Sequence, residues 1–120
     1  MNNQPIAIDL SLIADLCKED RNTAEKMFQL FLKNMPTAIA EMQNYCSLED
    51  WKKLYQTAHH VKSSLSIIQI PELLILIQNI ESNSKKLINL HQLPKLTEQV
   101  AMHYQQIEPQ IQQALNNMIS

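Results

Sequence analysis

Residues 51–65 read WKKLYQTAHHVKSSL, and the apolar members of this stretch recur at intervals of three and four residues. That interval is typical of an α-helix with one buried face. The apolar members are Leu54, Ala58, Val61 and Leu65. Just upstream, Ser47 and Asp50 are residue types that cap the start of a helix. We therefore expect an amphipathic helix over about residues 48–68.

The same repeat runs through most of the chain and predicts four further helices. Their expected bounds are about 9–18, 21–46, 71–82 and 94–118. Four long amphipathic helices with short connections favour an antiparallel up-down-up-down four-helix bundle, with a short extra N-terminal helix at 9–18. Pro36 and Pro109 fall inside the apolar repeat, so we expect them to bend their helices rather than end them. The predicted fold class is all-α, in a single domain over residues 1–120.

The composition agrees with a helical protein and disfavours several functions. The 120 residues include no glycine, on which hairpin turns and phosphate-binding loops depend. A net charge of −2 offers no basic face to nucleic acid. The longest apolar stretch, residues 73–77, is too short to cross a bilayer, and the first twenty residues lack the features of a signal peptide. Cys17 and Cys46 lack metal-ligand spacing and fit reduced thiols. We expect a soluble, cytoplasmic protein.

His59 is the candidate functional residue of the helix around residues 51–65. At about 100° per residue it lies roughly 130° from the centre of the apolar stripe, and His60 points to the opposite flank. Its own flank holds Tyr55, Lys62, Ser63 and Ser66. A neutral imidazole nitrogen is a competent nucleophile near neutral pH, and a lysine one turn away can offset the charge of a phosphoryl group. By itself, an exposed His-x-x-Lys pattern is more often a solvated helix face than a site.

The stretch AHHVKSS, residues 58–64, resembles the signature of histidine-containing phosphotransfer (HPt) domains, which is typically Ala-His-x-Leu/Ile/Val-Lys-Gly-Ser/Ala. The resemblance extends over most of the chain, and it implies an antiparallel helical bundle with His59 as the phospho-acceptor. Lys62 matches the family lysine one turn after the histidine. Glu81 matches a Gln/Glu of the following helix that hydrogen-bonds the acceptor imidazole. In that role Glu81 would accept the Nδ1–H and leave Nε2 free to attack.

Two positions depart from the family pattern, since Ser63 and Gln69 stand where the family usually has glycine. Ser63 permits a partner's backbone to approach less freely than glycine does, and Gln69 removes an easy helix cap. The effect of both changes on partner affinity stays open. Ile67 is expected either to be covered by the next helix or to meet a docking partner, and Ile13 to extend such a surface beside His59.

The resemblance implies a phosphorelay carrier rather than an autonomous enzyme. A receiver-domain aspartate, or a sensor or hybrid histidine kinase, would donate a phosphoryl group to His59. A response-regulator aspartate would then take the group onward. The family pattern implies no cofactor of the chain's own, with Mg²⁺ on the partner receiver domain. We expect a monomer with no nucleic-acid or membrane partner.

Three alternatives remain open. One is the isolated phosphotransfer domain of a chemotaxis-type kinase, although a chain that starts at Met1 and ends within its last helix favours a stand-alone protein. Another is a helical-bundle adaptor that binds a receiver domain without accepting phosphate. The most distant is a metal-binding bundle, because His91 and His103 have no acidic or cysteine companion at ligand spacing. The cognate kinase, the regulator, the pathway output and the direction of phosphoryl flow are also open.

Overall fold

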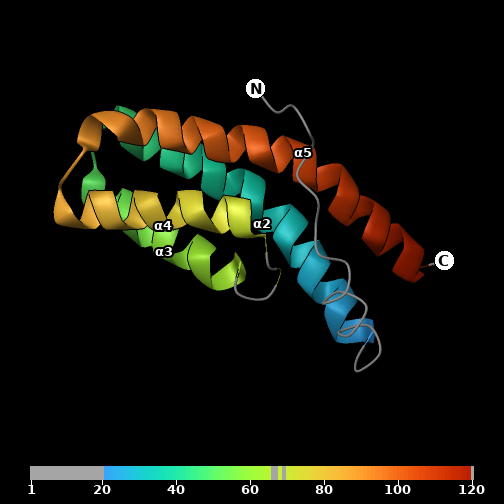
Figure 1. The fold of residues 1–120 in the computed structure, drawn as a ribbon. Coiled ribbons are helices and arrows are strands. Elements are labelled where there is room, and N and C mark those ends of the chain that lie inside the picture. The colour runs from blue at the N-terminus through green and yellow to red at the C-terminus, as the bar shows by residue number, and fades with distance from the viewer. Residues whose placement is uncertain (1–20, 66–67, 69, 120) are drawn as a thin grey trace.

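The computed structural model describes residues 21–65, 68 and 70–119. Its elements are α2 (Arg21–Ser47), α3 (Trp51–Leu65), α4 (Pro71–Lys86), the 3-10 helix η1 (Leu90–Gln92) and α5 (Leu93–Ile119). Figure 1 shows these elements in chain order, and the described residues contain helices but no strand. The helix expected at residues 9–18 lies outside the described residues.

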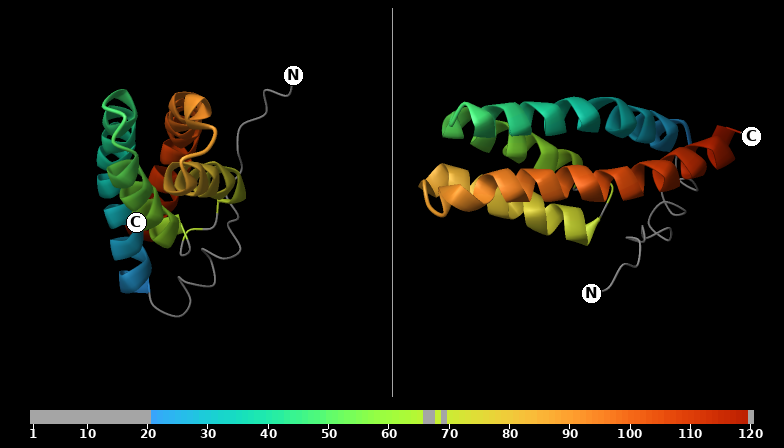
Figure 2. Two further views of the ribbon diagram at one scale, coloured as in Figure 1. Left: turned by 90° about the vertical axis from the view of Figure 1, so that its left-hand side faces the viewer. Right: turned by 90° about the horizontal axis from the view of Figure 1, so that it is seen from above.

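The four long helices form an antiparallel bundle. α2 packs against α3 and α5, and α4 also packs against α3 and α5, so each helix has two neighbours. Consecutive helices run in opposite directions, and the two further views of Figure 2 show the same arrangement. α2 and α5 are each 27 residues long, whereas α3 and α4 have 15 and 16. The longer pair extends beyond α3 and α4 at one end of the bundle (Figure 1). The predicted all-α up-down-up-down bundle is confirmed.

The core forms where the apolar stripes of the helices meet. In α2 the buried residues follow the expected repeat and are Ala24, Phe28, Phe31, Met35, Ile39, Met42 and Cys46. The four apolar residues named above for residues 51–65 are also buried. α4 and α5 contribute isoleucines and leucines to the same cluster. Because these stripes are continuous along each helix, burial of the core determines which face of α3 remains in solvent.

The start of α3 differs from the prediction. The helix begins at Trp51, and Asp50 caps it by accepting a hydrogen bond from the Lys53 backbone N–H at 3.2 Å. Ser47 is instead the last residue of α2, where its hydroxyl donates to the Gln43 carbonyl. Of the two residues expected to cap this helix, Asp50 does so and Ser47 does not, and the helix begins at Trp51 rather than at about residue 48. Residues 48–50 form the turn between α2 and α3 and so cannot belong to either helix, and Glu49 in this turn has a positive φ of 54°.

The end of α4 also differs from the prediction. The helix continues to Lys86, although a polar connection was expected from residue 82. Ser84 is buried, and its hydroxyl donates to the Ile80 carbonyl within the helix. Two lysines in the last turn suit the negative end of the helix dipole. Leu87 then ends the helix in the left-handed conformation, with φ of 56°.

The remaining helix boundaries lie close to the predictions. Pro71 occupies the first turn of α4, and α5 begins at Leu93, one residue before the expected start. Pro36 and Pro109 lie inside α2 and α5 without ending them. Figure 1 shows that both of these helices curve along their length. Within the described residues, no helix is long and apolar enough to cross a membrane.

Candidate functional site

His59 projects from the solvent side of α3. The helix buries Leu54, Ala58 and Val61, and the residue after Ala58 must therefore turn away from the core. The His59 side chain is 54% exposed. An imidazole in this position can be reached by another protein while its helix stays anchored in the bundle.

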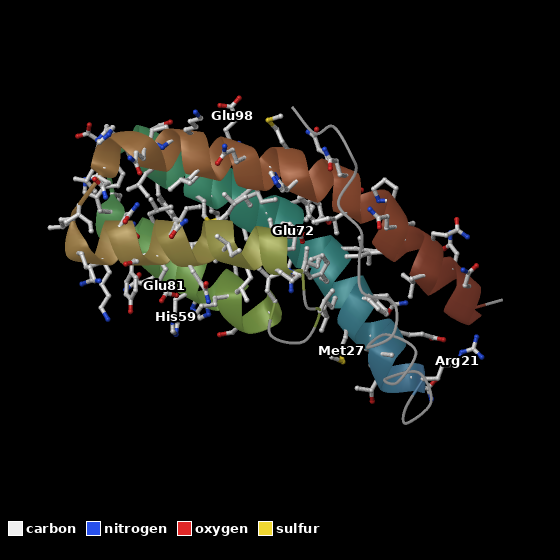
Figure 3. The ribbon with its side chains drawn as sticks, in the orientation of Figure 1. Arg21, Met27, His59, Glu72, Glu81 and Glu98 are labelled. Atoms are coloured by element: carbon white, nitrogen blue, oxygen red, sulfur yellow. The ribbon has the colours of Figure 1, made fainter. Side chains whose placement is uncertain are left out.

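Glu81 of α4 meets His59 across the α3–α4 contact. Its Oε2 lies 3.3 Å from Nδ1 of His59, and its Oε1 accepts a hydrogen bond of 2.9 Å from Nζ of Lys62. Figure 3 shows His59 and Glu81 together on one side of the bundle. The Glu81 side chain is only 17% exposed, so this carboxylate is the most sheltered member of the three. The structure thus brings together all three residues that were expected at the reacting centre.

The charge of Glu81 is maintained by its neighbours. Burial by itself raises the pKa of this carboxyl, but the hydrogen bond and positive charge of Lys62, together with His59, outweigh burial. The net effect lowers the pKa of Glu81 below its usual value. Glu81 is therefore an anion at neutral pH and can only accept hydrogen bonds.

The acceptor character of Glu81 determines the state of the His59 ring. A carboxylate that contacts Nδ1 requires the proton of a neutral imidazole to be on Nδ1. The lone pair is then on Nε2, the nitrogen that does not contact Glu81. The geometry thus leaves one ring nitrogen available as a nucleophile.

Tyr55 and Lys85 extend the site by one helical turn. The Tyr55 ring lies 6.2 Å from the His59 ring, measured between centroids, and the two planes are tilted by 39°. Nζ of Lys85 lies 5.5 Å from the centroid of the Tyr55 ring. Lys85 was not among the residues singled out from the sequence. Its signal was its position four residues after Glu81, which places both on the same face of one helix.

Of the remaining predicted partner-binding residues, the structure describes only Ser63. Ser63 is exposed, and its hydroxyl donates to the His59 carbonyl at 3.3 Å. Ser66, Ile67 and Ile13 lie outside the described residues, and so does Gln69 at the second missing-glycine position. The proposed extension of a docking surface by Ile67 and Ile13 therefore stays a prediction.

A groove between α2 and α3 adjoins this face and was not expected from the sequence. It has a volume of about 470 Å³. Its walls include Met27, Leu30, Phe31 and Met35 of α2 with His60, Ser63 and Ser64 of α3. We refer to it as the α2–α3 groove. His60 therefore lies beside apolar residues of α2 on its own flank of α3. Ser63 lies at the border between the groove and the His59 face.

The other histidines have no comparable surroundings. Nδ1 of His103 lies 2.7 Å from the Gln99 carbonyl oxygen, so the ring N–H donates a hydrogen bond within its own helix. His91 is exposed in η1. Across residues 21–65, 68 and 70–119, no three His, Cys, Asp or Glu side chains gather as a group that could hold a metal ion.

Comparison with protein families matches the Hpt domain over residues 26–120. The chain therefore belongs to the Hpt family, whose members carry phosphoryl groups on histidine in two-component phosphorelays and interact with receiver domains and kinases. No curated protein and no solved structure gives a significant match.

Proposed function

We propose that the protein is a phosphorelay carrier whose phospho-acceptor is Nε2 of His59. The observation that carries the proposal is the contact between Nδ1 of His59 and the Glu81 carboxylate, combined with the solvent exposure of the ring. This arrangement leaves the lone pair on the nitrogen that does not contact Glu81, in a ring that another protein can reach. The family match supports histidine as the carrier residue.

The proposed transfer needs no catalytic group beyond those of the two proteins. Nε2 attacks the phosphorus of an aspartyl phosphate, the N–P bond forms, and the P–O bond to the aspartate breaks. The electron pair of that bond leaves on the aspartate as a carboxylate. The His59 ring keeps its Nδ1 proton and becomes positively charged, and the Glu81 anion stabilises that charge. Transfer to a second aspartate reverses these steps.

Lys62 has a separate role in this proposal. Its ammonium group is a compact charge on a flexible stem, one turn along α3 from His59. In the unphosphorylated protein it is bound to Glu81 at 2.9 Å. We infer that it turns toward the phosphoryl oxygens when they arrive, because the equatorial oxygens carry most of the charge in the transition state. The acidic pocket and Mg²⁺ would belong to the receiver domain, and the chain would act as a substrate and shuttle.

The α2–α3 groove is the proposed docking place for the receiver domain. It combines an apolar wall from α2 with small polar residues of α3, and it borders the His59 face at Ser63. Leu30 in this wall is 55% exposed. An apolar surface rimmed by polar residues is typical of a protein interaction site. In the view of Figure 3, Met27 of the groove and His59 lie along the same lower edge of the molecule.

Substitution of the acceptor tests the function. His59→Gln should keep the fold and abolish acid-labile labelling when the protein is mixed with radiolabelled, phosphorylated receiver domains. His91→Gln is the matched control, because it removes an exposed imidazole of η1 that does not line the groove, and it should label normally. Normal labelling of His59→Gln, or phosphohistidine found at His60 instead of His59, would contradict the assignment.

Binding measurements separate this function from that of an adaptor. A carrier should form phosphohistidine at His59 and pass the label to a second receiver domain. A receiver domain that binds equally well to His59→Ala, with no phosphohistidine in the unchanged protein, would favour an adaptor that binds without phosphotransfer.

A further inference from the structure

Lys85 is a cation beside the site that no carboxylate in the described part of the chain neutralises. Nζ of Lys62 lies 2.9 Å from Glu81, whereas Nζ of Lys85 lies over the Tyr55 ring, 5.5 Å from its centroid, and pairs with no carboxylate of residues 21–65, 68 and 70–119. Lys85 is also exposed. Its charge is therefore available to an anion that arrives from outside.

Position on the two helices places this cation about one helical turn from the contact between His59 and Glu81. Tyr55 precedes His59 by one turn of α3, and Lys85 follows Glu81 by one turn of α4. Because α3 and α4 are antiparallel, both residues are displaced from the His59–Glu81 contact toward the same end of the bundle. The centroid of the Tyr55 ring lies 6.2 Å from that of the His59 ring and 5.5 Å from Nζ of Lys85, and both distances agree with that placement. Lys62 lies toward the opposite end, one turn after His59.

The two lysines differ in how firmly they are held. Lys62 makes a charge-assisted hydrogen bond to a sheltered carboxylate, which is among the stronger polar contacts in proteins. The exposed ammonium group of Lys85 over the half-buried Tyr55 ring makes no hydrogen bond to a carboxylate among the described residues and is held more weakly. To bind an incoming dianion, Lys62 must therefore first break its ion pair with Glu81, whereas Lys85 has only to move away from the Tyr55 ring.

We propose that Lys85, held over Tyr55, is a second cationic residue for the phosphoryl group on His59, on the side of the imidazole opposite Lys62. This inference rests on the proposed function of His59. Lys85 adds no covalent step, since its ammonium group interacts with phosphoryl oxygens while the N–P bond forms and breaks as described above. Lys62 and Lys85 then lie on two sides of the dianion and offset the negative charge of Glu81, which contacts the other nitrogen of the ring.

The test uses a small phosphoryl donor so that receiver docking does not contribute. The full chain is incubated with potassium phosphoramidate, and phosphohistidine is followed by ³¹P NMR at low salt and in 1 M KCl. Lys85→Gln should slow phosphorylation by about threefold to tenfold at low salt, with a smaller difference at 1 M, where the Debye length is about 3 Å. It should also raise the pKa of the bound phosphoryl group, because a nearby cation favours the dianion. Lys85→Arg should restore both properties.

Lys53→Gln is the matched control. Lys53 is an exposed lysine whose Nζ lies 5.9 Å from the centroid of the Tyr45 ring, so the substitution changes the net charge equally and removes the same type of contact. Lys53 also pairs with Asp50, away from His59. Identical rates and phosphoryl pKa values for Lys85→Gln and Lys53→Gln would overturn the inference while leaving His59 as the acceptor. Absence of phosphohistidine in the unchanged protein, or equal labelling of His59→Gln, would overturn the proposed function itself.

Discussion

Glu81 uses its two carboxylate oxygens for different purposes. Oε2 faces Nδ1 of His59, and Oε1 accepts the hydrogen bond from Lys62. The Glu81 carboxylate thus determines which nitrogen of the His59 ring is protonated, and it also binds the Lys62 ammonium group one turn along α3. In the proposed transfer, the same carboxylate would repel an arriving phosphoryl dianion, and Lys62 would then have an electrostatic reason to leave Glu81.

The pH dependence of stability should reveal the charge of Glu81. Because folding lowers the pKa of this carboxyl, its stabilising effect is complete above the ordinary glutamate pKa of about 4.3 and is lost as the pH falls through the lowered value. Glu81→Gln should therefore be less stable than the unchanged protein by about 0.5–1 kcal/mol at pH 7, with the difference shrinking below pH 4. Urea denaturation at several pH values measures this.

Glu41→Gln is a suitable control for that measurement. Glu41 is an exposed glutamate within α2, and its substitution removes the same charge without touching the site. A pH-dependent loss of stability as large in Glu41→Gln as in Glu81→Gln would show that the effect is one of net charge alone.

At the scale of elements, the site depends on how α3 and α4 begin and end. α3 starts only after Asp50 has capped it, and α4 continues for four residues beyond the predicted end, to Lys86. The extra turn of α4 is what carries Lys85 and brings it beside Tyr55 of α3. The helix ends therefore determine which side chains share the His59 face.

Removal of the α3 cap should destabilise the bundle. Asp50→Ala removes the acceptor of the Lys53 N–H, and the loss of an N-cap side chain typically costs about 1 kcal/mol. Ser47→Ala should cost much less, because the Ser47 hydroxyl bonds only to a carbonyl within α2. Thermal or urea unfolding compares the two variants, and a larger loss in Ser47→Ala would restore Ser47 as the cap.

Leu87 offers a test of backbone strain in a chain without glycine. Its φ of 56° belongs to the left-handed region, which a β-carbon disfavours by about 1 kcal/mol or more. Leu87 is 61% exposed, so little buried area is lost on replacement. Leu87→Gly should raise the free energy of unfolding by about 0.5 kcal/mol after the greater freedom of glycine in the unfolded chain is included.

Leu48→Gly is the matched control for this backbone effect. Leu48 is a similarly exposed leucine, at 66%, but it is not among the residues with positive φ. Glycine at this position should lower the stability, because it increases the conformational entropy of the unfolded chain and relieves no strain in the folded one. Stabilisation by both substitutions would mean that left-handed strain at Leu87 is not the cause.

At the scale of the whole molecule, the bundle separates the proposed phospho-acceptor from the proposed docking surface. His59 and Glu81 lie along the α3–α4 contact, whereas the α2–α3 groove lies on the other flank of α3. α3 is common to both, so a partner seated in the groove is next to the imidazole. A rigid helix can thus hold the acceptor at a constant distance from a bound partner.

Leu30→Glu should weaken receiver binding while leaving phosphorylation by phosphoramidate unchanged. A charge in the apolar wall of the groove opposes burial, and we expect a loss of about tenfold in affinity, or 1.4 kcal/mol. Met102→Glu is the control, since Met102 of α5 has the same exposed fraction, 55%, on a helix that does not line the groove. Calorimetric titration with the receiver domain that labels His59 fastest measures both. An equal loss in the two variants would place the docking surface elsewhere.

The sequence alone determined the helices, their buried stripes and the outward direction of His59. These features follow from interactions between residues three and four apart, which a helical repeat reveals directly. The repeat did not decide between Ser47 and Asp50 as the cap of α3, because both are good cap residues by type. It also did not reveal the length of α4, because the Ser84 hydroxyl has a partner only once the helix has formed.

Only the tertiary structure decided what surrounds the outward histidine. Glu81 lies 22 residues from His59 in the chain, and without the family resemblance nothing local connects the two. The contact of Lys85 with Tyr55 and the shape of the α2–α3 groove likewise depend on the register of one helix against another. Register is set by the packing of the whole core, so pairs across helices are determined by the bundle rather than by either helix.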